Sequence, residues 1–233
     1  MKRDKLQAIL NKNERIDDLQ FEGLKIIQNK DYYCFSSDAV LLANFVKAKK
    51  SDTIVDLCSG SGVVGILAQA KTKAKNLIMV EKQKELFEIC QKSILLNNLQ
   101  NRAVVYNIDA IDAPKLLGTE KFDVVCANPP YYLPSQKKLS GNKVVDIAKF
   151  EMDFTFDDLC KTAERLLKFG GKFFLVSDSE RIVELLSTLK KYHLEPKIVK
   201  FAFANLEKYS KVVLIESVKY GKQGTKVYIQ KQN

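Results

Sequence analysis

The chain of 233 residues lacks an apolar run long enough to cross a bilayer, and no apolar stretch suited to a signal peptide follows its start. Its five cysteines are widely spaced in apolar contexts and form no C-x-x-C pair. This spacing indicates reduced core thiols rather than a disulfide framework or a metal site. The only histidine, His193, is predicted at the end of a distal helix and receives no catalytic role. We therefore expect a cytoplasmic protein without membrane or metal.

Arginine is also scarce, and lysine supplies most of the formal net charge of +10. A basic chain favours an anionic partner such as nucleic acid. A genome-wide composition bias toward lysine explains the same excess equally well. The length and the 46% of apolar residues predict one large domain or two small ones with a substantial core.

One segment combines a buried strand with an abrupt stop. Val124–Ala127 is uncharged and rich in valine, and Asn128, Pro129, Pro130 and Tyr131 follow it. The prolines lack N–H groups and fix their own φ, so the strand must end at the asparagine. The loop then offers an amide oxygen, backbone carbonyls with few competing donors, and an aromatic face. It suits a planar group that donates two hydrogen bonds, such as the exocyclic amine of adenine or a glutamine amide. A simple strand-ending turn is the alternative.

The rest of the chain alternates strands with helices. We expect a hairpin of residues 21–28 and 32–35, then a helix over 39–46 capped by residues 36–38. Further strands are expected at 53–58, 77–80, 103–106, 172–176, 197–203 and 211–218, with helices between most of them. The last two of these strands follow each other without a helix, so the final one should lie antiparallel. This order predicts an α/β fold with a doubly wound, mostly parallel, seven-stranded sheet covered on both faces. Residues 133–150 show little periodicity, and we expect a mobile surface loop there.

A glycine loop lies between the first of these core strands and its helix. Gly60, Gly62 and Gly65 satisfy G-x-G-x-x-G, and Glu81 follows at the distance expected for an acid that binds a ribose. This pattern fits NAD as well as an adenosyl cofactor. Asp56, just before the loop, would oppose the pyrophosphate of a dinucleotide but favour the ammonium and sulfonium groups of S-adenosylmethionine. A capping or turn role for Asp56 is the alternative.

Asp109 ends the third core strand. A carboxylate at that edge can accept a hydrogen bond from the adenine amine of a cofactor. A turn residue, followed by Asp112 and Pro114, is the alternative.

Taken together, these motifs resemble those of class I S-adenosylmethionine-dependent methyltransferases in order and spacing. The Asn-Pro-Pro-Tyr motif resembles the one used by amino-group methyltransferases. Phe35–Leu42 and the ending Val212–Glu216 are similar to segments of the bacterial tRNA1(Val) adenine N6-methyltransferase family. The resemblance covers roughly residues 20–220.

The resemblance implies a Rossmann-like fold that binds S-adenosylmethionine and methylates N6 of an adenine in tRNA, next to the anticodon of tRNA(Val). It implies an N-terminal extension at 1–50, a methyltransferase domain at 51–220, a tail at 221–233, and action as a monomer. Asn128, Pro129, Pro130 and Tyr131 become the catalytic residues. The implied cofactor-binding residues are Asp38, Asp56, Ser59, Gly60, Gly62, Glu81, Lys82, Asp109, Ala110 and Asn128. For the RNA surface, the lysine-rich segment beside the site offers Lys137, Lys138, Lys143 and Lys149, and a solvated face is the alternative for them.

The implied mechanism agrees with the residues. Adenine's amine is a weak nucleophile because its lone pair is delocalised into the ring. Hydrogen bonds to the Asn128 side chain and the Pro129 carbonyl favour a more tetrahedral nitrogen, while Tyr131 stacks on a base swung out of its helix or loop. Positioning and electrostatics supply most of the rate, and no strong general base is required.

Other acceptors and classes stay open at this point. Enzymes that methylate a protein glutamine amide use the same loop but carry an N-terminal helical module, whereas only about fifty residues precede the first core strand here. DNA adenine methylation usually calls for an added target-recognition region, and rRNA guanine methyltransferases often have Phe where Tyr131 stands. An NAD-dependent oxidoreductase would leave Asp56 and the Asn-Pro-Pro-Tyr loop unexplained. A non-catalytic RNA-binding protein on a methyltransferase fold is the third class.

Overall fold

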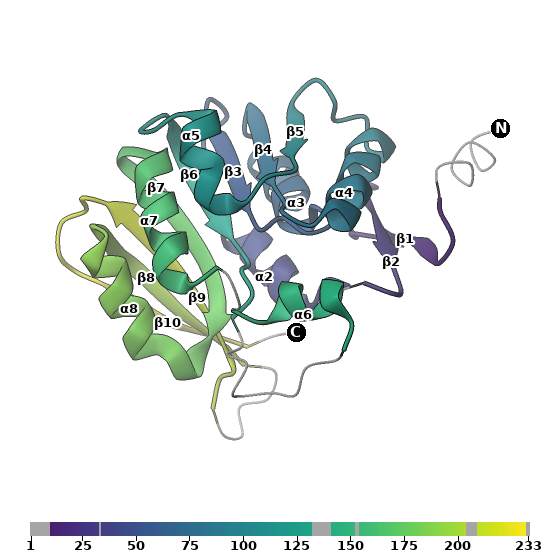
Figure 1. The fold of residues 1–233 in the computed structure, drawn as a ribbon. Helices are drawn as coiled ribbons and strands as arrows, with labels where there is room; N and C mark the ends of the chain where they lie inside the picture. Colours follow the sequence, from purple (N-terminus) through teal and green to yellow (C-terminus); the bar gives the residue numbers. More distant parts are fainter. Residues whose placement is uncertain (1–9, 33, 132–140, 152–153, 204–208, 232–233) are drawn as a thin grey trace.

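The computed structural model describes residues 10–32, 34–131, 141–151, 154–203 and 209–231 (Figure 1). Within these ranges no helix is both long enough and apolar enough to span a membrane. An eight-stranded sheet runs through the centre of the molecule, and a separate two-stranded hairpin lies beside it near α4 (Lys84–Leu96).

The central sheet has the order β10-β8-β9-β7-β6-β3-β4-β5. Its strands are β3 (Thr53–Leu57), β4 (Asn76–Val80), β5 (Ala103–Tyr106), β6 (Phe122–Ala127), β7 (Leu167–Asp178), β8 (Leu194–Phe203), β9 (Val212–Lys219) and β10 (Lys226–Lys231). Only β9 runs against its neighbours, pairing antiparallel with both β7 and β8. The predicted antiparallel hairpin of the last two core strands is therefore confirmed.

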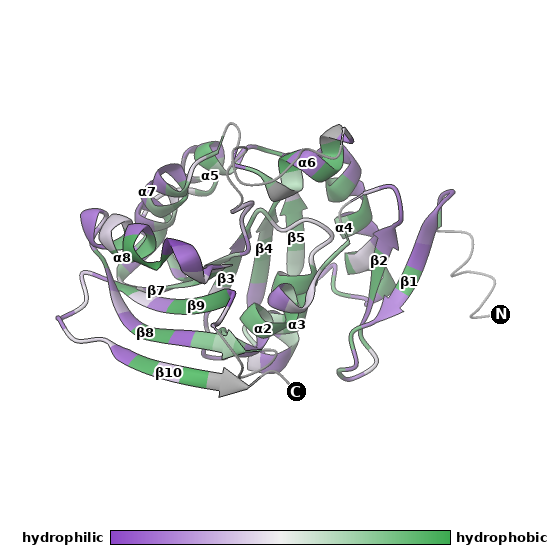
Figure 2. Cartoon of the chain, turned by 90° about the horizontal axis from the view of Figure 1, so that it is seen from below, coloured by the Kyte–Doolittle hydropathy of each residue, from purple (hydrophilic) through white to green (hydrophobic). Residues whose placement is uncertain are grey.

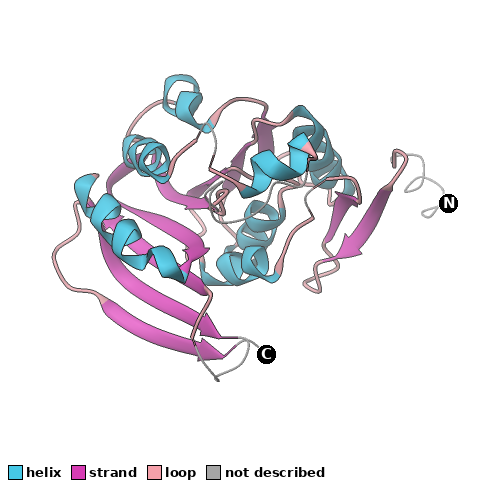
Figure 3. Cartoon of the chain, turned by 60° about the horizontal axis from the view of Figure 1, so that its bottom comes forward, coloured by secondary structure: helices cyan, strands magenta, loops and turns pink. Residues whose placement is uncertain are grey.

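Helices cover both faces of this sheet, as Figure 3 shows. The helices α2 (Ser37–Phe45), α3 (Val63–Thr72) and α4 pack on one face, and α5 (Ala113–Leu117), α7 (Phe156–Leu166) and α8 (Ile182–Lys191) pack on the other. Strand β6 shows why: Val124 and Cys126 belong to the first apolar cluster, whereas Val125 and Ala127 belong to the second. Successive side chains of a strand point to opposite faces, so a strand buried on both is apolar throughout. Figure 2 shows this apolar centre between more polar helix surfaces. The predicted doubly wound α/β fold is confirmed.

The N-terminal hairpin differs from its prediction. β1 (Glu14–Asp18) pairs antiparallel with β2 (Lys25–Asn29), so residues 32–35 are not its second strand. Of the five residues of β1, four are charged and only Ile16 is apolar, so alternation of apolar and polar residues could not reveal it. β2 is anchored on α4, because the Ser93 hydroxyl accepts a hydrogen bond from the Ile27 amide at 3.1 Å.

The loop predicted at 133–150 and the tail at 221–233, in which residues 226–229 favour a strand, both contain regular structure. Within 133–150, residues 143–149 form the helix α6 (Lys143–Lys149), and Asn142 caps it by accepting hydrogen bonds from the amides of Val144 and Val145. Residues 132–140 lie outside the described part of the chain. The tail at 221–233 contributes β10, which pairs parallel with β8 and adds an eighth strand to the seven expected. Helix α2 begins at Ser37, and Ser36 at its N-cap makes no side-chain capping bond.

The core of the sheet can be tested by two substitutions on one strand. Phe174 of β7 is fully buried and meets Phe45 edge-to-face at 5.7 Å, whereas Phe169 of the same strand is 78% exposed. Phe174→Ala should lower the free energy of unfolding by about 3–5 kcal/mol, because it removes buried apolar contacts and leaves a cavity. Phe169→Ala should cost no more than about 1.5 kcal/mol, the value of its stacking on Tyr220. Urea unfolding of both variants measures the difference, and equal losses would contradict this account of the core.

Candidate active site

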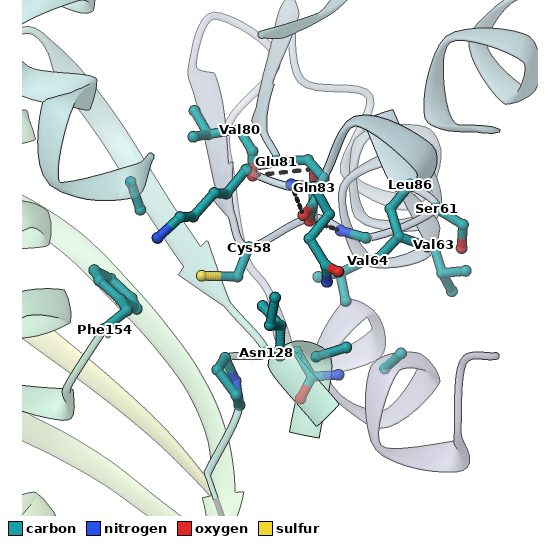
Figure 4. Close-up of a pocket in the computed structure, with 18 of the residues that line it drawn as sticks. Cys58, Ser61, Val63, Val64, Val80, Glu81, Gln83, Leu86, Asn128 and Phe154 are labelled. Atoms are coloured by element: carbon teal, nitrogen blue, oxygen red, sulfur yellow. Dashed lines mark hydrogen bonds between the residues drawn. The ribbon is translucent and has the colours of Figure 1, made fainter. Parts of the chain in front are cut away.

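A cavity opens at the carboxyl edge of the parallel strands. β3 and β6 are neighbours, and their register pairs Leu57 with Ala127. Both strands therefore end at the same level, and the residues that follow, Cys58 and Asn128, both lie in the cavity wall (Figure 4). Ligands of open α/β sheets bind at this edge, where adjacent loops diverge.

The cavity gathers most of the residues predicted to bind the cofactor. Those in its wall are Ser59, Gly60, Glu81, Lys82, Asp109, Ala110 and Asn128. Pro130 of the predicted catalytic set joins them, while Asp38, Asp56 and Gly62 do not line the cavity. Residues that were not predicted to bind the cofactor complete the wall: Phe35, Ala39, Cys58, Ser61, Val63, Val64, Val80, Gln83, Leu86, Ile147, Ala148, Phe150 and Phe154.

The glycine loop follows β3 and gives the cavity its floor. Gly60 adopts φ +55°, and a Cβ there would meet no atom within 4 Å, so this position leaves open space toward the cavity. Gly62 at the start of α3 adopts φ +92°, and its Cβ would lie 2.8 Å from the Cys90 sulfur. Only glycine adopts such backbone values freely, so the first position keeps room above the loop and the second allows close packing below it.

Asp56 lies beneath this loop. Its carboxylate is buried and accepts a hydrogen bond from the Gly65 amide at 2.9 Å, while the Cys126 thiol lies 3.6 Å away. Burial raises its pKa from 3.8 to about 7. Asp56 is not among the residues that line the cavity, so the structure gives no support for its expected direct contact with the cofactor. The carboxylate instead fixes the first turn of α3, close to the capping role that was the alternative.

Glu81 directly follows β4 and faces the glycine loop. Its two carboxylate oxygens accept hydrogen bonds from the amides of Gly60 and Gln83, each at 2.8 Å (Figure 4). Burial raises its pKa from 4.5 to about 7. These bonds hold a carboxylate at the cavity wall, where the predicted contact with a ribose would be made.

Asp109 follows β5 and plays the turn role that was the alternative for it, while its contact with a cofactor stays a prediction. One oxygen accepts a hydrogen bond from the Ile111 amide at 3.1 Å and caps the short helix η1 (Ala110–Asp112). The other lies 2.9 Å from the ammonium group of Lys82. The carboxylate nevertheless remains in the wall of the cavity, about a quarter exposed.

The N-terminal hairpin reaches this site through Gln28. Its side chain is buried, donates to the Ser61 hydroxyl at 2.6 Å and accepts from the Phe35 amide at 2.9 Å. Ser61 belongs to the glycine loop, and Phe35 lines the cavity. One amide side chain thus ties the loop, the hairpin and the segment before α2 together.

The Asn-Pro-Pro-Tyr loop is held at its last residue. The Tyr131 hydroxyl donates to the Asp38 carboxylate of α2 at 2.9 Å, and the Tyr131 carbonyl accepts from Arg181 at 2.9 Å. Asp38, which was predicted to bind the cofactor, accepts this bond and does not line the cavity. The hydroxyl is engaged in this bond, and neither Tyr131 nor Pro129 is among the residues that line the cavity.

The predicted RNA-binding lysines fall on two kinds of segment. Lys137 and Lys138 lie outside the described residues, and Lys143 and Lys149 mark the two ends of α6. Among the described residues no group of three or more His, Cys, Asp or Glu side chains could hold a metal ion. Two cysteines correct the reading of all five as core thiols, since Cys34 and Cys58 are only partly buried.

The methyltransferase small domain family matches residues 35–202 of the chain. The chain therefore belongs to this family, and its domain is of the S-adenosylmethionine-dependent methyltransferase class. Membership decides against the oxidoreductase alternative and confirms the resemblance to this class.

The chain is similar to curated proteins that are named as methyltransferases. A tRNA1(Val) (adenine(37)-N6)-methyltransferase of a Flavobacteriaceae bacterium is 22% identical over 67% of this chain and 64% of its own length. One from Bacteroides thetaiotaomicron is 24% identical over 75% of this chain and 72% of its own. The chain thus spans less than two thirds of the first relative and more of the second.

Among solved structures, a predicted O-methyltransferase from Agrobacterium tumefaciens has a TM-score of 0.64 at 22% identity and covers 83% of this chain and 85% of its own. The M. jannaschii TYW2 in complex with AdoMet has a TM-score of 0.60 at 15% identity and covers 90% and 86%. At these identities the likeness shows the fold.

The cavity fits S-adenosylmethionine as its cofactor. The open space at Gly60 admits a ligand against the loop backbone, and α3 presents its N-terminal end there for a carboxylate. Glu81 supplies an acceptor for hydroxyl groups, and Val80 and Leu86 supply apolar walls for a flat ring. The particular residues that contact each part of the cofactor remain predictions.

Asp56 makes stability depend on pH in a direction that can be checked. Its pKa is higher in the folded protein, so the folded state binds more protons, and the free energy of unfolding falls as pH rises from about 4 to about 7. Asp56→Asn keeps an acceptor for the Gly65 amide without the charge. It should be more stable than the wild type above pH 7, by at most about 4 kcal/mol, and lose this advantage toward pH 4. Thermal denaturation across this range measures the difference, and parallel profiles would contradict it.

Proposed function

We propose that the protein methylates the exocyclic N6 amine of an adenine in tRNA, with adenine 37 of tRNA(Val) as the particular target, in the cytoplasm. The observation that carries this proposal is the place of Asn128. It directly follows β6 in the wall of the cavity that also contains Glu81 and the glycine loop. The names of the curated relatives support tRNA and position 37 as the acceptor.

The site residues account for the chemistry. S-adenosylmethionine, when bound, supplies an electrophilic methyl group. The Asn128 side-chain oxygen and the Pro129 carbonyl accept the two hydrogens of the adenine amine and turn its lone pair toward that group. The Tyr131 ring stacks on the extruded base, with its hydroxyl anchored on Asp38 at 2.9 Å. Orientation and electrostatics lower the barrier. The amine loses its proton to solvent after the attack, so no strong general base is required.

A protein glutamine amide or an rRNA base amine is the second acceptor class, since each presents a planar amino group to the same loop. The basic charge of +10 favours RNA over a protein substrate, because phosphate contacts from lysine release counterions. Binding to tRNA should accordingly weaken steeply with salt. Lys137, Lys138, Lys143 and Lys149 are the proposed contacts beside the site.

Turnover on total tRNA tests the acceptor. Unmodified tRNA is incubated with labelled S-adenosylmethionine, digested to nucleosides and analysed by mass spectrometry. N6-methyladenosine identifies donor, acceptor atom and RNA class together. Cofactor binding without any labelled nucleoside would reject tRNA, and parallel reactions with rRNA and with protein extract then separate the remaining acceptors.

Asn128 should be essential for transfer. Asn128→Ala removes the amide oxygen that orients the amine, and kcat should fall roughly 100-fold or more while the dissociation constant for S-adenosylmethionine changes little. Asn128→Asp keeps an acceptor and should lose less than the alanine variant. Single-turnover kinetics and calorimetric titration of the cofactor measure the two quantities, and normal turnover by Asn128→Ala would reject the assignment.

A further inference from the structure

The Asn-Pro-Pro-Tyr loop has few backbone donors of its own to hold it in place. Pro129 and Pro130 have no N–H groups, so neighbouring elements must fix the loop through its carbonyl oxygens and side chains. Two such contacts meet at Tyr131, one on its hydroxyl from Asp38 and one on its carbonyl from Arg181. The position of Asn128, three residues earlier, depends on this end of the loop.

Arg181 reaches the loop from the other half of the sheet. It ends the short helix η2 (Ser179–Arg181) between β7 and α8, and Asp178 caps that helix by accepting from the Glu180 amide at 2.9 Å. Its guanidinium is buried and pairs with two carboxylates, Glu151 and Glu184. Such a group, deprived of water, keeps a fixed geometry only when its donors are matched by acceptors.

Glu151 connects Arg181 to the element that covers the cavity. It lies just beyond α6, whose residues Ile147 and Ala148 line the cavity together with Phe150. The opposite end of this element is tied to the hairpin, because the Asn142 side chain donates to the Asp31 carbonyl at 2.7 Å. The ion pair with Arg181 therefore anchors the end of the cover nearest the catalytic loop.

We propose that Arg181 is a positioning residue that sets the catalytic loop and the cover helix α6 relative to each other. One nitrogen, Nη1, donates both to the Tyr131 carbonyl and to the Glu151 carboxylate. The other donors, Nε and Nη2, hold Glu184 of α8 and fix the plane of the guanidinium. This inference rests on the proposed function, since the loop it places is the one that binds the acceptor amine.

The geometry requires arginine rather than any cation. Five donors in a rigid planar fork serve four acceptor atoms of three residues at once, whereas a lysine ammonium is a single compact centre on a flexible stem. Arg181→Lys keeps the charge that balances buried Glu151 but cannot make the same set of contacts. Glu151→Gln keeps the shape of the side chain and removes its charge, which weakens the tie to α6 and spares the tie to Tyr131.

The inference predicts that Arg181→Lys lowers kcat without a matching loss of stability. Arg181→Lys should lower kcat on tRNA about 10- to 100-fold, because small displacements of a reacting pair are costly. The KM for tRNA and the melting temperature should change little, and Glu151→Gln should fall between Arg181→Lys and the wild type. Arg102→Lys makes the same chemical change at an exposed arginine before β5 and should match the wild type. A variant Arg181→Lys with normal kcat, or with a loss that follows only its melting temperature, would overturn the inference.

Hydrogen exchange tests the same inference without the reaction. Both proteins are compared with S-adenosylmethionine bound. The amides of peptides covering residues 122–131 and 141–151 should exchange faster in Arg181→Lys than in the wild type, while those of β4 and β5 should exchange at the same rate in both. If the wild type methylates no tRNA, the proposed acceptor is wrong and the exchange result alone decides. Unchanged exchange in both segments would then reject the positioning role.

Discussion

The parallel pairing of β3 with β6 is the contact on which the site depends. Its register places Leu57 opposite Ala127, so the glycine loop and Asn128 leave the sheet at the same level. A shift of one residue would turn each side chain of β6 to the opposite face and exchange its two apolar partners. The buried contacts on both faces of β6 therefore fix the distance between the cofactor loop and the acceptor loop.

Two buried carboxylates also hold the glycine loop and the helix that follows it. Asp56 holds the amide of Gly65 in α3, and Glu81 holds the amide of Gly60 in the loop. Both carboxylates are costly to ionise where they lie, and their pKa values near 7 follow from that burial. The two carboxylates thus hold the cofactor loop in its conformation before any ligand binds. This reduces the ordering of the loop that binding must impose.

Local signals predicted the parts of the site that depend on backbone chemistry. The glycines, the two prolines and the alternation of strands and helices each act within a few residues, and they placed the core strands and both loops. β1 was missed because its side chains are mostly charged and it pairs through its backbone. α6 was missed although Asn142 and the apolar residues after it carry a helix-start signal. The positions of Asp38 and Asp56 could not be predicted, because each depends on which partner the fold brings within reach, Tyr131 for one and Gly65 for the other.

Gln28 connects the first fifty residues to the cofactor loop. Its buried amide bonds both to Ser61 in the glycine loop and to the Phe35 backbone, across the boundary drawn between extension and domain. Removing the hairpin would leave the Ser61 hydroxyl without this donor and open one side of the pocket. The extension and the core are therefore joined by buried polar contacts at the glycine loop. Recombination with related domains would preserve the pocket only if the exchanged segment began ahead of the hairpin, because a crossover near residue 50 would separate the glycine loop from the side chain that steadies it.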